Sequence, residues 1–126
     1  MAMSVKEMLA AANAAVPRIS VQEAKALQGD PRVVFLDVRE PSEVAASGKV
    51  PGALTIPRGL LEFRADPESP LHDAAFDRAK TVIAYCASGG RSALAGKTLK
   101  DMGYTDVRNL GGFKDWVEGG GSVEPG

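Results

Sequence analysis

Hydrophobic residues occur along the chain in short blocks with two kinds of spacing. Residues 32–38 (RVVFLDV) and 81–85 (TVIAY) are largely apolar runs without alternation, which predicts strands buried on both faces. Shorter strands are predicted at 53–57 (ALTIP) and 105–110 (TDVRNL), and a short extended segment opens residues 18–30. Together these segments give five predicted strands.

Helices are predicted between the strands. Two of them begin with the pattern S-x-x-E, Ser4 with Glu7 and Ser20 with Glu23, a capping box in which serine and glutamate satisfy the first backbone amides. The first box makes residues 1–16 an N-terminal capped helix, which ends before a proline. Further helices are expected at 40–48, 60–65, 91–102 and 113–119.

Alternation of strands and helices predicts an α/β fold with a mainly parallel sheet and helices on both faces. No repeat or linker divides the pattern, so residues 1–126 are expected to form a single domain. A hydrophobic content of 44% and a charged content of 25% argue against disorder and membrane spanning. The net charge of -1, without a basic run, argues against a nucleic-acid partner.

The chain contains one cysteine and one histidine. A single cysteine excludes an intramolecular disulfide, and the two residues are too few for a Cys/His zinc site. A free cysteine suits a reducing, cytoplasmic location. The alanine-rich start is not interpreted as a signal peptide, because Glu7 and Asn13 interrupt its apolar stretch.

Cys86 stands between a predicted strand and a predicted helix, at the edge of the sheet where open α/β folds bind ligands. The next residues, ASGGR, have small side chains and two glycines, so the loop amides can turn inward beside a helix start and stabilise an anion. An ordinary cysteine, with a pKa of about 8.5, is only about 3% thiolate at pH 7, and such a loop raises that fraction. This predicts an activated nucleophile.

Each part of this segment also has an ordinary structural explanation. Free cysteines often pack as small hydrophobic residues, and a Gly-Gly pair before a helix often forms only a tight turn. The combination of strand, cysteine, loop, arginine and helix within a dozen residues favours catalysis. The loop alone leaves the substrate open, since phosphate, arsenate, thiosulfate and a persulfide would all be stabilised by it.

Three blocks resemble the signature blocks of single-domain rhodanese-like sulfurtransferases, in the same order: LDVREPSEVAASGKVPGALTIP, VIAYCASGGRSALAGKTLKDMGY and VRNLGGFKDW. The resemblance covers about residues 17–118 and implies an α/β domain around a five-stranded parallel sheet. It also implies that Cys86 accepts a sulfane sulfur as a persulfide and passes it to a thiophilic acceptor, a relay for which we expect no metal and no cofactor. The active-site loop, which would bind the substrate, is then formed by Ala87, Ser88, Gly89, Gly90 and Arg91.

Other residues receive supporting roles. Arg91 is expected to supply a fixed positive charge at the end of the loop or to tie the loop to its helix. Asp37 lies in the family's D-x-R block, where it commonly holds the site by charged hydrogen bonds. Arg39 is expected either to join Asp37 in that support or to form a surface ion pair, and Arg58 could reach the pocket entrance. Glu43 is expected to be a solvated helix residue and His72 to be incidental. Gly111 and Gly112 match the family's glycine pair and are expected to form a turn before the last helix, and Trp116 is expected in the core.

Two other function classes remain open. The loop of phosphatases and arsenate reductases of the related cell-cycle type resembles C-x-x-x-x-x-R, with the arginine six positions after the cysteine. Here Arg91 stands five positions after Cys86, and the shorter loop suits a single sulfur atom. Non-catalytic binding modules of the rhodanese-like type typically lack the cysteine. Sulfur transfer therefore fits best.

The loop also bears on the donor. Apart from Arg91 it carries no charge, whereas efficient thiosulfate users often have extra basic residues there. We therefore hypothesise that a protein or low-molecular-weight persulfide is the donor and thiosulfate a laboratory substitute, with a thiol or cyanide as acceptor. The chain is expected to act as a monomer or a homodimer.

Overall fold

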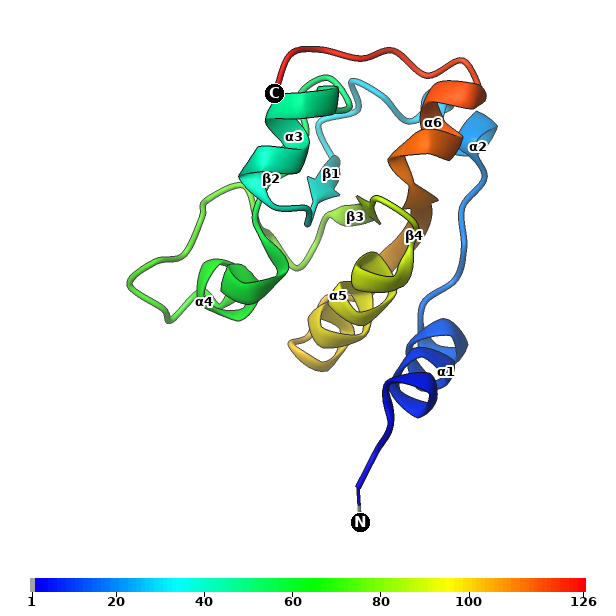
Figure 1. Cartoon of the computed structure of the whole chain (residues 1–126). Helices are drawn as coiled ribbons and strands as arrows, with labels where there is room; N and C mark the ends of the chain where they lie inside the picture. The colour runs from blue at the N-terminus through cyan, green and yellow to red at the C-terminus, as the bar shows by residue number, and fades with distance from the viewer. Residues whose placement is uncertain (1) are drawn as a thin grey trace.

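The computed structural model describes residues 2–126, and Figure 1 shows its helices and strands. In chain order they are α1 (Val5–Ala15), α2 (Val21–Ala26), β1 (Val33–Asp37), α3 (Pro41–Ser47), β2 (Leu54–Thr55), the 3-10 turn η1 (Arg58–Leu60), α4 (Leu61–Ala65), β3 (Thr81–Cys86), α5 (Gly90–Asp101), β4 (Asp106–Gly112) and α6 (Phe113–Glu118). The strands form one sheet in the order β2-β1-β3-β4, with every neighbouring pair parallel. The predicted α/β class is confirmed.

The sheet has four strands rather than the five that were predicted. The extended segment before α2 makes a single parallel bridge, between Arg18 and Asn109. Ser20 follows at once, and its side chain accepts a hydrogen bond from the backbone N–H of Glu23, 3.1 Å away, to begin α2. The chain therefore turns into a helix before a fifth strand can form.

The predicted capping boxes are confirmed at α1 and α2. In α1 the Ser4 hydroxyl accepts from the Glu7 backbone N–H at 3.1 Å, and the Glu7 carboxylate accepts from the Ser4 backbone N–H at 3.1 Å. The end of α1 packs on α5, where the Val16 methyl groups would lie 3.0 Å from a Cβ atom at Gly96. No helix within residues 2–126 is long and apolar enough to cross a membrane.

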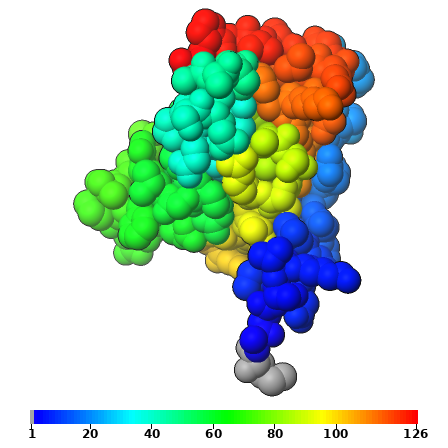
Figure 2. Space-filling model, viewed as in Figure 1, coloured from blue at the N-terminus to red at the C-terminus, as the bar shows by residue number. Residues whose placement is uncertain are grey.

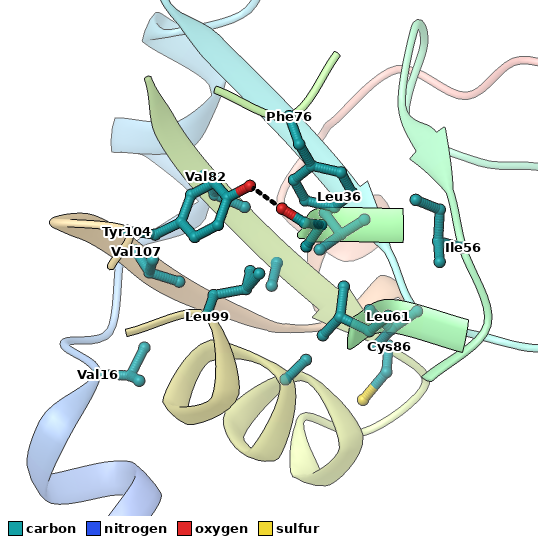
Figure 3. Close-up of a cluster of buried hydrophobic side chains, with 14 residues drawn as sticks. Val16, Leu36, Ile56, Leu61, Phe76, Val82, Cys86, Leu99, Tyr104 and Val107 are labelled. Atoms are coloured by element: carbon teal, nitrogen blue, oxygen red, sulfur yellow. Dashed lines mark hydrogen bonds between the residues drawn. The ribbon is translucent and has the colours of Figure 1, made fainter. Parts of the chain in front are cut away.

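Side chains of β1 and β3 are buried on both faces of the sheet, which explains why these segments show no alternation. On one face, with α4 and α5, the main core residues include Leu36, Val38, Leu61, Val82, Ala84, Cys86 and Leu99 (Figure 3). On the other, with α2 and α6, they include Ala24, Phe35, Ile83, Tyr85, Phe113 and Trp116. Trp116 is fully buried, as predicted.

A terminal strap, residues 119–126, crosses from α6 to α3 and appears in red in Figure 1. The Trp116 indole N–H donates to the carbonyl of Ser122 at 2.7 Å, and the backbones of Lys49 and Glu124 exchange hydrogen bonds of 2.9 Å. The strap thus holds the segment that follows α3, the helix that carries Glu43.

Candidate active site

Cys86 is the last residue of β3, and its side chain lies on the α5 face of the sheet (Figure 3). The residue is 1% exposed. Three residues later the backbone N–H of Gly89 donates to the Cys86 Sγ atom at 3.0 Å. Gly89 has a φ of +103°, a conformation that favours glycine, and this turn aims its amide back at the sulfur.

A buried network of polar side chains, Ser92 and Asn109, supports the loop. The Ser92 Oγ atom lies 3.5 Å from the Cys86 Sγ, 3.1 Å from the Gly89 carbonyl oxygen and 2.8 Å from Asn109 Oδ1. Asn109 Nδ2 donates to the same Gly89 carbonyl at 3.3 Å, and Asn109 Oδ1 accepts from the backbone N–H of Gly111 at 2.9 Å. Ser92 is fully buried and Asn109 is 2% exposed, so this network is shielded from water.

The loop favours the thiolate form of Cys86. Burial alone raises the pKa of this thiol, but hydrogen bonds from the Ser92 hydroxyl and from the backbone amides of Ser92, Gly89 and Ser88 outweigh it and lower the pKa below its ordinary value. These amides belong to the loop and the first turn of α5, where the helix dipole also favours negative charge. The site can therefore hold a nucleophilic sulfur anion.

The glycine pair at the end of β4 lets the loop approach the strand. A bulge shifts the register between β3 and β4 after Ala84, so that Gly112 pairs with Cys86. A Cβ atom at Gly112 would collide with the carbonyl oxygen of Ala87. Gly111 and Gly112 thus belong to the strand and admit a close backbone contact, whereas the sequence indicated only a turn.

Arg91 binds Glu43 across the mouth of the loop. Its Nη1 and Nη2 atoms lie 2.6 and 2.9 Å from the two carboxylate oxygens, and each side chain is about a third exposed. Hydrogen bonds from Arg91 lower the pKa of Glu43 to about 2, and the bonds from Glu43 raise the pKa of Arg91, with a further contribution from the charge of Cys86. The expectation that Glu43 is merely solvated is wrong.

Asp37 and Arg39 form a buried ion pair on the other face of the sheet. Asp37 is opposite Tyr85 in the strand register, and since adjacent side chains of a strand point to opposite faces, Asp37 and Cys86 point away from each other. Arg39, 4% exposed, donates from Nε to Asp37 Oδ1 at 3.0 Å and from Nη2 to Oδ2 at 2.8 Å. Its guanidinium carbon lies 4.5 Å from the centroid of the Phe113 ring. Arg39 therefore forms a buried ion pair with Asp37, and the alternative of a surface ion pair is wrong.

The remaining sequence candidates lie at the edges of the site. Arg58 donates to Thr98 Oγ1 at 2.9 Å and to Glu62 Oε1 at 3.0 Å, and thus connects the turn before α4 to α5. His72 lies in the loop after α4, where its backbone N–H donates to the Ser69 carbonyl. Within the loop, Ala87 and Ser88 are exposed, Gly89 is buried, and Gly90 is the first residue of α5.

The start of α5 reaches the surface between α3, α4 and α6. Figure 2 shows this segment in yellow, bordered by α3 in cyan, by the region of α4 in green and by α6 in orange. Sequence reasoning found the loop but missed Glu43, Ser92 and Asn109. Ser92 could have been noticed as the residue directly after Arg91 in the first turn of the helix, whereas the other two partners come from distant segments.

Comparisons with known proteins agree with this geometry. A family model described as the rhodanese-like domain matches residues 20–119. The thiosulfate:glutathione sulfurtransferase of Homo sapiens is 32% identical over 112 residues, which cover 83% of this chain and 96% of that protein. The Saccharomyces cerevisiae protein of the same name is 37% identical over 110 residues, 81% of this chain and 78% of its own.

Solved structures show the same fold. A Rhodopseudomonas palustris protein of unknown function, described as a possible tyrosine phosphatase, superposes with a TM-score of 0.91 at 41% identity and covers 98% of this chain and 96% of its own. A human single-domain sulfurtransferase superposes with a TM-score of 0.67 at 31% identity and covers 82% of this chain and 96% of its own. The chain therefore belongs to the rhodanese-like family of sulfurtransferases.

Proposed function

We propose that the protein transfers a sulfane sulfur through a persulfide on Cys86. The Cys86 thiolate attacks the outer sulfur of the donor, and the donor S–S bond breaks. The leaving group departs with the bonding electron pair, as sulfite from thiosulfate or as a thiolate from a persulfide. An acceptor thiolate or cyanide then attacks the outer sulfur of Cys86, which forms a new persulfide or thiocyanate and restores the cysteine.

The observation that carries the proposal is the contact of 3.0 Å between the Gly89 amide and the Cys86 sulfur. An amide fixed in this direction stabilises negative charge both on the attacking thiolate and on the persulfide that replaces it. The amides of Ser88 and Ser92 also lower the thiol pKa, so the nucleophile needs no separate general base. The loop residues 87–91 thus have the substrate-binding role in this proposal.

A thiol is the preferred acceptor in this proposal. Both relatives compared above are named thiosulfate:glutathione sulfurtransferases, which supports a thiol rather than cyanide as the natural acceptor. Cyanide serves as a laboratory acceptor, because it attacks the same outer sulfur. The single free cysteine also supports a reducing, cytoplasmic setting for a protein that acts as a monomer or a homodimer.

Phosphate ester hydrolysis is the second candidate, favoured by the description of the Rhodopseudomonas palustris relative as a possible tyrosine phosphatase. Two features oppose it. The loop places Arg91 five positions after Cys86, one fewer than the phosphatase spacing described above. The Glu43 carboxylate also binds both terminal nitrogens of Arg91 and balances its charge, so the guanidinium offers less positive potential to a phosphate dianion.

Mass spectrometry of the intact protein tests the proposal. After incubation with thiosulfate, we expect one added sulfur atom, which is lost on treatment with cyanide together with formation of thiocyanate. Cys86→Ser is the control and must take up no sulfur. If neither thiosulfate nor a persulfide adds sulfur to the wild type, yet the protein hydrolyses an aryl phosphate, the sulfurtransferase mechanism is wrong.

A further inference from the structure

The Glu43–Arg91 ion pair leaves the loop without a net side-chain charge. Arg91 is the sole charged residue among positions 87–91. Its two terminal nitrogens contact both oxygens of the Glu43 carboxylate at 2.6 and 2.9 Å, so the arginine is paired in a bidentate geometry. The positive potential around the sulfur therefore comes from backbone amides and from an arginine whose charge Glu43 balances, not from an unpaired cation.

Glu43 is held in this position by its own helix. Its carboxylate Oε1 also accepts from the backbone N–H of Glu40 at 3.0 Å, as the second half of the box that begins α3. One side chain thus caps α3 and holds Arg91. This double attachment fixes the carboxylate beside Arg91.

Donors differ in the charge that they bring to this site. Thiosulfate carries two negative charges, one of them spread over a sulfonate group beside the reacting sulfur. A persulfide carries at most one charge on its S–S group. The loop amides attract both kinds of donor, but the second charge of thiosulfate is repelled by the Cys86 thiolate, and an unpaired cation nearby would reduce that repulsion.

We infer that the Glu43–Arg91 pair is a specificity determinant that selects persulfides, with a single charge at the reacting sulfur, over the dianion thiosulfate. The inference rests on the proposed sulfur transfer and specifies its donor class. Glu43 acts here as a positioning and charge-balancing residue. It takes no part in the bond-forming step.

Two small donors of similar shape and different charge separate the effect of donor charge from the effect of donor shape. Thiosulfate and methanethiosulfonate both present a terminal sulfur on a tetrahedral sulfur atom, but the second carries one charge, because a methyl group replaces an oxygen. The Cys86 thiolate takes the terminal sulfur from either, and sulfite or methanesulfinate leaves with the electron pair. In a two-step transfer the donor kcat/KM reports only steps up to the persulfide, so one acceptor, cyanide, serves both assays.

The quantity to measure is the ratio of kcat/KM for thiosulfate to kcat/KM for methanethiosulfonate. The test compares this ratio in each variant with the ratio in the wild type. Glu43→Gln leaves Arg91 without its counter-charge and is expected to raise the ratio about three- to tenfold. Arg91→Gln leaves an unpaired carboxylate and should lower the ratio by a similar factor. The double variant removes both charges and should return close to the wild-type ratio.

Asp101→Asn is the matched control. It removes the same charge at the far end of α5, about 17 Å along the helix from Gly90, and should leave the ratio unchanged. A ratio that stays within twofold of the wild type in both Glu43→Gln and Arg91→Gln overturns the inference while the proposed function stands. If the wild type forms no persulfide with either donor, the proposed function fails and the inference fails with it.

Discussion

The guanidinium of Arg39 lies alongside the carboxylate of Asp37 in a buried bidentate pair, at 2.8 Å between Nη2 and Oδ2. The chain repeats the pattern D-x-R at Asp30–Arg32, where Arg32 is 86% exposed. A third D-x-R pair, Asp106–Arg108, is joined at 3.0 Å between partly exposed side chains. The same local pairing therefore occurs once in the core and twice at the surface. This coincidence offers an internal control for the effect of burial.

Asp37→Asn is expected to lower the free energy of unfolding by about 3–5 kcal/mol, because it leaves Arg39 buried without a counter-charge. Asp30→Asn should cost about 0–1 kcal/mol, since its partner is solvated. Urea denaturation followed by tryptophan fluorescence measures both. Equal losses in the two variants would contradict the assignment of Asp37 to the buried support of the sheet edge.

The pH dependence of Cys86 alkylation follows from its lowered pKa. Only the thiolate reacts with iodoacetamide, so the rate should reach half its maximum at a lower pH than it does for an unperturbed cysteine. Ser92→Ala removes the side-chain hydrogen bond that does most to lower this pKa, and its midpoint should move to higher pH. A midpoint that does not move would show that the amides alone stabilise the thiolate.

Asn109→Ala should disturb both stability and the loop. The change leaves the Gly111 amide without its side-chain acceptor in a buried site, at a cost of about 1–3 kcal/mol, and removes one of the donors to the Gly89 carbonyl. The rate of persulfide formation should also fall, because the turn that aims the Gly89 amide loses its support. Asn13→Ala, on the exposed face of α1, is the control and should change neither quantity.

The Glu43–Arg91 pair should stabilise the fold in a pH-dependent way. The pKa of Glu43 falls from 4.5 to about 2 in the folded protein, so its contribution is fully present above pH 4.5 and is lost as the pH falls through about 2. Because both side chains are about a third exposed, solvent screening limits the contribution to about 1 kcal/mol. The difference in unfolding free energy between wild type and Glu43→Gln should therefore shrink between pH 5 and pH 2. A difference independent of pH would contradict this.

Features set by neighbouring residues could be predicted from the sequence. The caps of α1 and α2 depend on residues three positions apart, and the Cys86 loop is a continuous strand, turn and helix. The short extended segment at Arg18 counts as a strand in the sequence, but it makes only one bridge, to Asn109, before the Ser20 cap begins α2, so local pattern overstates its pairing.

Features set by distant contacts could not be predicted in this way. Glu43 lies 48 positions from Arg91, and its place in the first turn of α3 already has a local explanation as a capping residue. Asn109 lies 17 positions from Ser92 in a strand whose pattern indicated only burial. Such partners become visible only when the sheet brings their segments together.

The close contact between the Ala87 carbonyl and Gly112 has a consequence for how this fold can change its chemistry. β4 lies in close contact with the loop and leaves no space between them. The additional loop residue that the phosphatase spacing requires therefore cannot be accommodated on the side of the strand. It must bulge toward solvent and draw the Gly89 amide away from the sulfur. We expect that any route from sulfur transfer to phosphate hydrolysis in this chain needs an insertion after Cys86 together with a retreat of β4, two changes that offer no benefit singly.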